Sequence, residues 1–383
     1  ANTWDTNKVT LVQNGSDKIG GSTVNASLDT EGSAVTLVFV DSTQGWLVTD
    51  SGLQSDASTA SFISASGGNS ITTIGNFKVH AFTGPGTFTV CSVGNPAGST
   101  TIETMIVAGG GGAGFDRAGG AGAGGMVLTP TCGIPVSASP GSYPITVGAG
   151  GAGIPNSLGP GPHTGANGTN STGFSLTAIG GGGSSRGGNS QPLAQVTGEP
   201  GGSGGGGSGG CGAVGPGGPT TQASQPGNSG TFGFGNVGGN AAPNPDNQTG
   251  GGGGAGAAGS NGVAGGSSGD GGAGKDVSPR FGTAPQPFYQ ANGPLQGASA
   301  AGIFAGGGGG GGSGPGGANS GGNGGPGGGG HGGDSPSNPG DRDGHPGTAN
   351  TGGGGGGSSN ISSSPDSGGN GGSGIVLIRY KFQ

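Results

Sequence analysis

The chain has 383 residues, of which 111 are glycine, 7% are charged and 27% are hydrophobic. A typical globular domain is about 7% glycine and about 45–50% apolar, so an ordinary hydrophobic core cannot organise the whole chain. The formal net charge of −7 excludes the basic surface that nucleic-acid binding requires. No stretch approaches the roughly 20 apolar residues that span a bilayer, and we expect no membrane insertion. The first twelve residues lack a secretory signal pattern, which favours synthesis without export; a leader already removed is equally compatible.

Residues 1–75 are expected to form a first β-domain. Short runs rich in β-branched residues occupy positions 9–13, 34–40 and 45–49, with glycine, asparagine and aspartate turns between them. In residues 34–40, Val35, Leu37 and Phe39 share one face of the expected strand, and Val38 and Val40 share the other. A strand that is apolar on both faces is buried on both sides. About 75 residues cannot easily supply that cover, so we expect subunits to pack together.

A second domain is expected over residues 76–383. Residues 77–82 and 87–91 read as two strands of a hairpin, and residues 101–108 read as a third strand that runs into glycine. Short apolar runs at 126–128, 143–147 and 174–179 then alternate with long glycine-rich excursions. The last run, residues 375–382, alternates as a strand should, and the strand at 101–108 is its expected partner. The sequence therefore predicts an all-β protein without significant helix, in which a small scaffold closed by strand 375–382 carries long glycine-rich loops.

The glycine-rich excursions have two possible structures. Residues 1–108 contain 13 glycines, so 98 fall in residues 109–383. The runs at 306–312 and 352–357 break the strict Gly-X-Y period of collagen. Extended glycine chains can approach closely enough for neighbouring backbones to hydrogen-bond in a layered lattice, called polyglycine II. The alternative is a disordered glycine/serine linker, against which stand the final strand and the lack of a second globular domain to link.

Few residues point to chemistry. Cys91, Cys132 and Cys211 form no Cys-x-x-Cys motif, and we expect them to be small buried residues or one incidental bridge. The weak metal candidates are His331, Asp341, Asp343 and His345. Their spacing matches no EF-hand, and the repeat of calcium β-helices is absent, so a solvated loop is the favoured interpretation. No catalytic triad or nucleotide-binding context is present. We therefore expect neither an enzyme nor a cofactor.

Aromatic residues in glycine-dominated sequence are the best binding candidates. Two groups stand out: the larger combines aromatic residues with an arginine, the residue types that dominate binding hot spots, and the smaller has two phenylalanines. The competing interpretation is that these side chains fill small hydrophobic gaps in the fold. The candidate receptor-binding residues are Arg280, Phe281, Phe288 and Tyr289, with Phe232 and Phe234 as a smaller group.

The order of several motifs resembles the glycine-rich fibre-tip adhesins of bacteriophage tail fibres. The N-terminal motifs are GGSTV at 20–24, GSAVTL at 32–37 and GWLV at 45–48; the later ones are FTGPGTFTV at 82–90, MIVAGGGG at 105–112, TVGAGG at 146–151 and GSGIVLIRY at 372–380. The chain departs from the family's pattern in a longer, proline-rich region at 195–300, which leaves the loop layout there open.

The resemblance implies a homotrimeric virion fibre, assembled in the host cytoplasm and exposed on the virion surface. Polyglycine-II packing would present variable loops that bind a host surface glycan or outer-membrane protein, and other virion tail or fibre proteins would be partners. Three alternatives remain: a head or neck appendage without a receptor, a glycine-rich filament of a cell surface, and an enzymatic tailspike, which would need a carboxylate pair in a groove.

Overall fold

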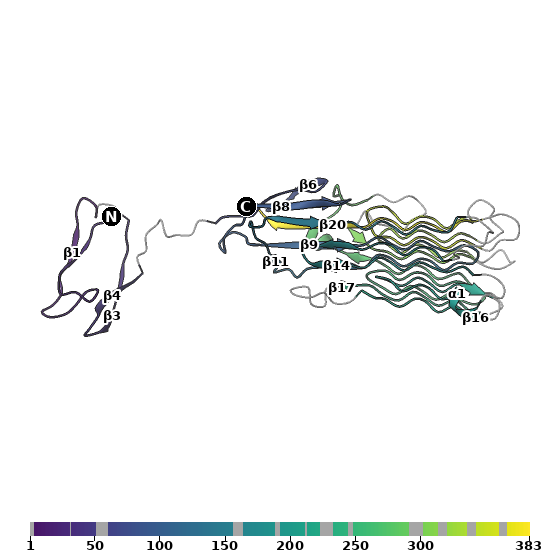
Figure 1. Cartoon of the computed structure of the whole chain (residues 1–383), viewed down its shortest axis with the longest axis horizontal. Coiled ribbons are helices and arrows are strands. Elements are labelled where there is room, and N and C mark those ends of the chain that lie inside the picture. The colour runs from purple at the N-terminus through teal and green to yellow at the C-terminus, as the bar shows by residue number, and fades with distance from the viewer. Residues whose placement is uncertain are drawn as a thin grey trace. The chain divides into compact units, whose positions relative to one another are not determined.

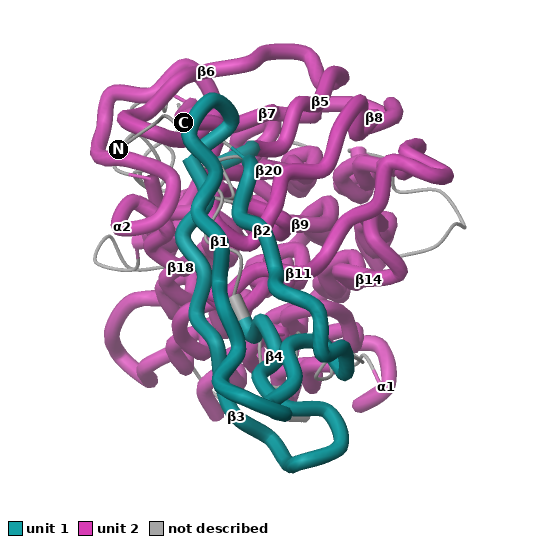
Figure 2. Tube along the Cα trace, turned by 90° about the vertical axis from the view of Figure 1, so that its left-hand side faces the viewer, with its two compact units in different colours: residues 1–61 teal, residues 62–383 magenta. Residues whose placement is uncertain are grey.

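The computed structural model divides the chain into two compact units, residues 1–61 and residues 62–383 (Figure 2). Residues 62–75, expected in the first domain, supply two strands to the second unit, because β5 (Ser64–Ser66) and β6 (Ser70–Ile74) pair with strands there. The described residues are 4–30, 32–50, 60–155, 164–187, 192–210, 213–222, 233–243, 248–290, 302–312, 320–334, 342–359 and 366–383.

The first unit consists of two strand pairs. β1 (Val9–Leu11) pairs with β2 (Ala26–Leu28), and β3 (Thr36–Asp41) pairs with β4 (Gly45–Asp50), both antiparallel. The expected burial of both faces of β3 does not occur within one chain, since Val38, Phe39 and Val40 are about half exposed. None of the hydrophobic side chains described in this unit reaches the core, which leaves its apolar surface open.

The second unit is built on a seven-stranded antiparallel sheet. Its strand order is β17-β10-β9-β20-β7-β6, with β11 also paired to β9. β20 lies between β9 and β7, so the expected pairing of the last strand with residues 101–108 is confirmed. The strands are β6 (Ser70–Ile74), β7 (Phe77–Phe82), β9 (Thr101–Val107), β10 (Met126–Leu128), β11 (Ile134–Pro135), β17 (Gly233–Phe234) and β20 (Ile375–Lys381).

A three-stranded sheet packs against one face of this larger sheet. It has the order β12-β8-β5, from β12 (Ser142–Ile145), β8 (Gly86–Ser92) and β5 (Ser64–Ser66). The prediction that residues 77–82 and 87–91 form a hairpin is wrong, because β7 and β8 belong to different sheets. The edges of β7 are taken by β6 and β20, and those of β8 by β5 and β12, so the turn between them is a corner of the sandwich.

Successive side chains of β9 and β20 point to opposite faces of the sheet, and each face belongs to a separate hydrophobic cluster. Ile106 and Ile378 point into the sandwich, where Tyr380 and the buried His80 also lie. The Nδ1 atom of His80 is 2.7 Å from the oxygen of Gly67, and its Nε2 atom is 3.1 Å from the hydroxyl of Tyr380. Burial lowers the pKa of His80. The opposite face, with Met105 and Leu377, is covered by residues 275–290 and their neighbours.

Short elements complete the second unit. The run expected at residues 174–179 is instead a hairpin, since Phe174 and Ser175 have positive φ and form its turn. The described residues contain two helices, each a single turn, and neither is long and apolar enough to cross a bilayer. These elements are β13 (Ser171–Gly173), β14 (Leu176–Ala178), α1 (Leu193–Val196), β15 (Gly209–Gly210), β16 (Ala213–Val214), β18 (Lys275–Asp276), α2 (Ser278–Phe281) and β19 (Ile303–Phe304).

Extended glycine-rich runs leave the sheets and lie side by side (Figure 1). Residues 118–125 form a central run that hydrogen-bonds with six neighbouring runs. Its N–H groups donate to three neighbours in rotation, so that positions three apart reach the same neighbour: Gly120 to Gly250 and Ala123 to Gly253, Ala121 to Gly355 and Gly124 to Gly352, Gly122 to Gly182 and Gly125 to Ile179. Its carbonyls accept from three further runs, through Gly111, Gly206 and Gly308.

A repeat of three residues with all backbone bonds made to other runs is the signature of polyglycine II. The glycine-rich runs that the structure describes thus form an ordered lattice, as the glycine content predicts, rather than a disordered linker. Glycine is required by contact: a Cβ at Gly122 would overlap the carbonyl oxygen of Ser203 and lie 2.7 Å from that of Gly204. The backbone groups themselves therefore take the place of a hydrophobic core here.

Candidate functional site

The predicted aromatic group is brought together, but inside the scaffold. Phe281 on α2 is fully buried, and Phe288 and Tyr289 are 2% and 8% exposed. The three side chains pack in one cluster with Phe304 against the sheet, with ring centroids of Phe288 and Tyr289 4.9 Å apart. These residues are core residues in this structure and present no surface to a receptor. The sequence analysis identified this group but made it the receptor-binding candidate, whereas its burial favours the competing interpretation that the side chains fill the hydrophobic core.

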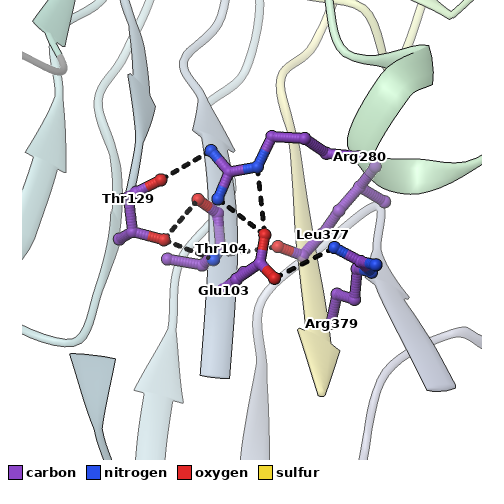
Figure 3. A network of polar contacts seen from close by, with 6 residues as sticks. All are labelled: Glu103, Thr104, Thr129, Arg280, Leu377 and Arg379. Atoms are coloured by element: carbon purple, nitrogen blue, oxygen red, sulfur yellow. Dashed lines mark hydrogen bonds and ion pairs between the residues drawn. The ribbon is translucent and has the colours of Figure 1, made fainter. Parts of the chain in front are cut away.

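Arg280, the fourth member, closes a buried polar network with Glu103 (Figure 3). Its Nε and Nη2 atoms donate to Oε2 of Glu103 at 3.0 and 2.6 Å, and its Nη1 donates to the carbonyl of Thr129 at 2.6 Å. Arg379 of β20 donates to Oε1 of the same carboxylate at 2.9 Å. Each charged side chain is less than a fifth exposed. The network ties α2 to β9 and β20, so Arg280 also has a structural role.

The smaller aromatic group is only partly described. Phe234 in β17 is half-buried against the hydrophobic cluster, and the Nζ atom of Lys275 lies 4.8 Å from the centroid of its ring. Phe232 lies outside the described residues. Cys91 and Cys132 are exposed free thiols, contrary to the expected burial, and Cys211 lies outside the described residues.

The weak metal candidates are distributed along neighbouring lattice runs. The N–H of His345 donates to the carbonyl of His331 at 2.9 Å, which places two runs side by side. The carboxylate of Asp343 accepts the N–H of Ser367 at 2.6 Å, and Asp341 lies outside the described residues. Within the described ranges, no three His, Cys, Asp or Glu side chains gather as metal ligands would.

Charged side chains instead gather where lattice runs end away from the sheets, here called the far end. Arg186 lies 3.5 Å from the carboxylate of Asp116, and its guanidinium is 4.7 Å from the centroid of the Phe115 ring. Burial raises the pKa of Asp116, against the opposing effect of two arginines. Backbone bonds join this turn to its neighbours: Arg117 donates to Ser359, Ser359 to Arg342, and Gly209 to Arg117.

Asp366 is the most perturbed carboxyl of this cluster. Burial raises its pKa to about 6, Arg342 opposes the shift, and Asp343 and Asp116 add to it. Its Oδ2 atom is buried and accepts no hydrogen bond from the residues that the structure describes. A carboxyl held in this way is costly to ionise, so charge at the far end depends on pH in the mildly acidic range.

Exposed apolar side chains accompany the charges at the far end. Leu193 on α1 is 56% exposed and Val214 on β16 is 42% exposed, whereas Val196 on the same helical turn is buried. Both elements lie at the far end (Figure 1). Sequence reasoning missed them. The available signal was their isolation as large apolar residues in glycine-rich sequence, which indicates neither exposure nor location.

Comparison with known families decides the family of the chain. The model of a glycine-rich domain family matches residues 81–381. The chain belongs to this glycine-rich domain family. No curated protein matches it.

The glycine-rich domain contains most of the second unit. Its match begins within β7 and ends at the last residue of β20, so β5 and β6 lie outside it. Both the Glu103 network and the far end fall inside the matched range. The domain thus combines a β-sandwich with a glycine-rich lattice, and several runs of this lattice end in charged and apolar side chains remote from the sandwich. Such an arrangement suits surface recognition, because recognition residues are commonly held on loops by a rigid scaffold.

Proposed function

We propose that the protein is a receptor-binding adhesin of a phage tail fibre and that the far end of its lattice contacts the host cell surface. The supporting observation is the concentration of Asp116, Arg186, Leu193 and Val214 where the runs end. Residues 118–125 and their neighbours are fixed by backbone hydrogen bonds. The described runs that lead to the far end are therefore held in place, and little of their conformational entropy is lost on binding.

The mixture of side chains at the far end suits a polar surface with local apolar contacts. Arginine and carboxylate groups can hydrogen-bond to glycan hydroxyls or to polar loops of an outer-membrane protein. Leu193 and Val214 can bury apolar area on contact, which contributes about 25 cal/mol per Å².

We further propose that copies of the chain associate through the first unit as a homotrimer. The supporting observation is the exposure of apolar side chains on both faces of β3, together with Trp46 and Val48 of β4. Several linked copies would raise the avidity of weak single contacts. The molar mass in solution by light scattering tests the association: three chain masses are expected, and a monomer would overturn it.

The adhesin proposal is tested by the binding of purified full-length protein to candidate host cells. The double variant Leu193→Ser/Val214→Ser is expected to lose most binding while melting at the wild-type temperature, because both side chains are already exposed. Ile71→Ser is the matched control, since Ile71 is 53% exposed on β6 of the scaffold. Undiminished binding by the double variant would show that Leu193 and Val214 do not contact the host surface. Failure of the folded wild type to bind any cell type would instead favour the appendage without a receptor.

A further inference from the structure

A polar pocket opens at the end of the sandwich opposite the lattice. The lattice leaves β9 after Val107 and enters β20 before Ile375, whereas the pocket is formed by Phe77, Thr101 and Lys381 at the other ends of β7, β9 and β20. Its volume is about 340 Å³, which is within the range of small-molecule sites. Residues 95–100 form a further wall of the pocket.

Arg379 is the principal charged group of the pocket. Its guanidinium carbon lies 3.6 Å from the centroid of the Phe77 ring, and its Nη1 atom donates to Glu103. Stacking and pairing fix the orientation of the guanidinium plane. Arginine has five N–H donors, and among the described residues the guanidinium of Arg379 donates one hydrogen bond, to Glu103. Donors of an oriented, 18% exposed guanidinium therefore remain available to a ligand in the pocket.

The surroundings of Arg379 favour an anionic group. Glu103 already holds two arginines, Arg280 and Arg379, so its charge is more than neutralised. Lys381 adds a second cation to the pocket wall, in a chain whose net charge is −7. Oriented arginine forks bind carboxylate and phosphate groups through two parallel hydrogen bonds.

The remaining wall favours a ligand rich in hydroxyl groups. Thr101 and Thr131 supply hydroxyls that can both donate and accept. We propose that this pocket binds an acidic monosaccharide, whose carboxylate pairs with Arg379 and whose hydroxyls bond to the two threonines. The site is remote from the far end and does not rest on the receptor-binding function proposed above.

Isothermal titration of the full-length protein with glucuronate, glucose and inorganic phosphate tests the site. Glucuronate is expected to bind, and glucose to bind about tenfold more weakly or worse, because it lacks the carboxylate that Arg379 recognises. Arg379→Gln is expected to abolish glucuronate binding. Glu103 keeps Arg280 as its partner in this variant, which preserves the fold.

Two further variants separate the pocket from the charge network. Thr131→Trp fills the pocket from an exposed position, leaves every charged group in place, and is expected to abolish binding. Lys275→Gln removes a cation from another aromatic ring, that of Phe234, and is expected to bind like the wild type. Equal affinity for glucose and glucuronate, binding of phosphate alone, or glucuronate binding that survives Thr131→Trp would each overturn the proposal.

Discussion

Replacing Gly122 by alanine tests whether backbone contact makes glycine obligatory in the lattice. Gly122 lies in the central run with an ordinary φ, so the substitution creates no backbone strain of its own. The new methyl group would overlap the carbonyl oxygen of Ser203, and relief requires the two runs to separate. Separation breaks the bonds that join them, from Gly206 to Gly120 at 2.7 Å and from Ser203 to Ala123 at 3.0 Å.

The expected loss follows from these two bonds. Breaking the two bonds leaves four buried groups without partners, two N–H and two C=O, at a cost of about 1 kcal/mol each at the lower end of the usual range. Alanine restricts the unfolded chain and so offsets about 0.4–1 kcal/mol of this loss. The free energy of unfolding should therefore fall by about 3 kcal/mol. With a denaturant slope of about 3 kcal/mol per molar urea, the unfolding midpoint should fall by about 1 M.

Gly84→Ala is the matched control for this experiment. Gly84 also has an ordinary φ, but a Cβ there meets no atom within 4 Å. The urea midpoint of this variant should stay the same or rise slightly, because its free energy of unfolding should rise by less than about 1 kcal/mol. If Gly122→Ala unfolds at the wild-type urea concentration, close contact is not the reason for glycine in the central run, and the account of the lattice fails.

Further predictions concern buried groups of the second unit. Phe281→Ala should lower the free energy of unfolding by about 3–5 kcal/mol, measured by urea denaturation; an unchanged midpoint would show that Phe281 is not in the core. Glu103→Ala should cost about 3 kcal/mol, because it leaves two largely buried arginines without their carboxylate, and a neutral result would contradict this role. The pKa of His80 is below its unfolded value of about 6.5, so neutral His80 stabilises the fold above that pH; stability should fall more steeply below pH 6.5 in the wild type than in His80→Gln, and equal slopes would refute it. The pKa of Asp366 is raised to about 6, so its protonated form is favoured in the fold and stability is lost as pH rises through 6; Asp366→Asn should raise the midpoint at pH 7.5 more than at pH 4.5, and the reverse order would exclude this assignment.

The sheet was predictable where alternation was strong. In residues 375–381, Val376 and Ile378 alternate with Leu377 and Arg379, and the strand pairs as expected with β9. The polyglycine-II packing was also predictable, because only glycine permits such close approach of backbones. The register of the runs was not, since glycine repeats carry no side chains that distinguish one pairing from another.

The candidate site was harder to predict, because burial of an aromatic residue depends on contacts distant in sequence. Phe281 and Tyr289 pack against a sheet face that includes Met105, far earlier in the chain, and Leu377, far later. Arg280 bonds to Glu103, 177 residues away. The hairpin expected around Gly84 failed for a related reason. Local turn chemistry cannot distinguish a hairpin from a corner between two sheets when other strands compete for the same edges.

Hydrogen exchange at the glycine amides of residues 118–125 tests the central claim most directly. The lattice account predicts that these amides exchange only through global unfolding, because each N–H from Gly120 to Gly125 donates to another run at 2.8–3.0 Å. Exchange at the rate of an unstructured glycine peptide, while β9 and β20 remain protected, would show that the glycine-rich runs are not held in a lattice.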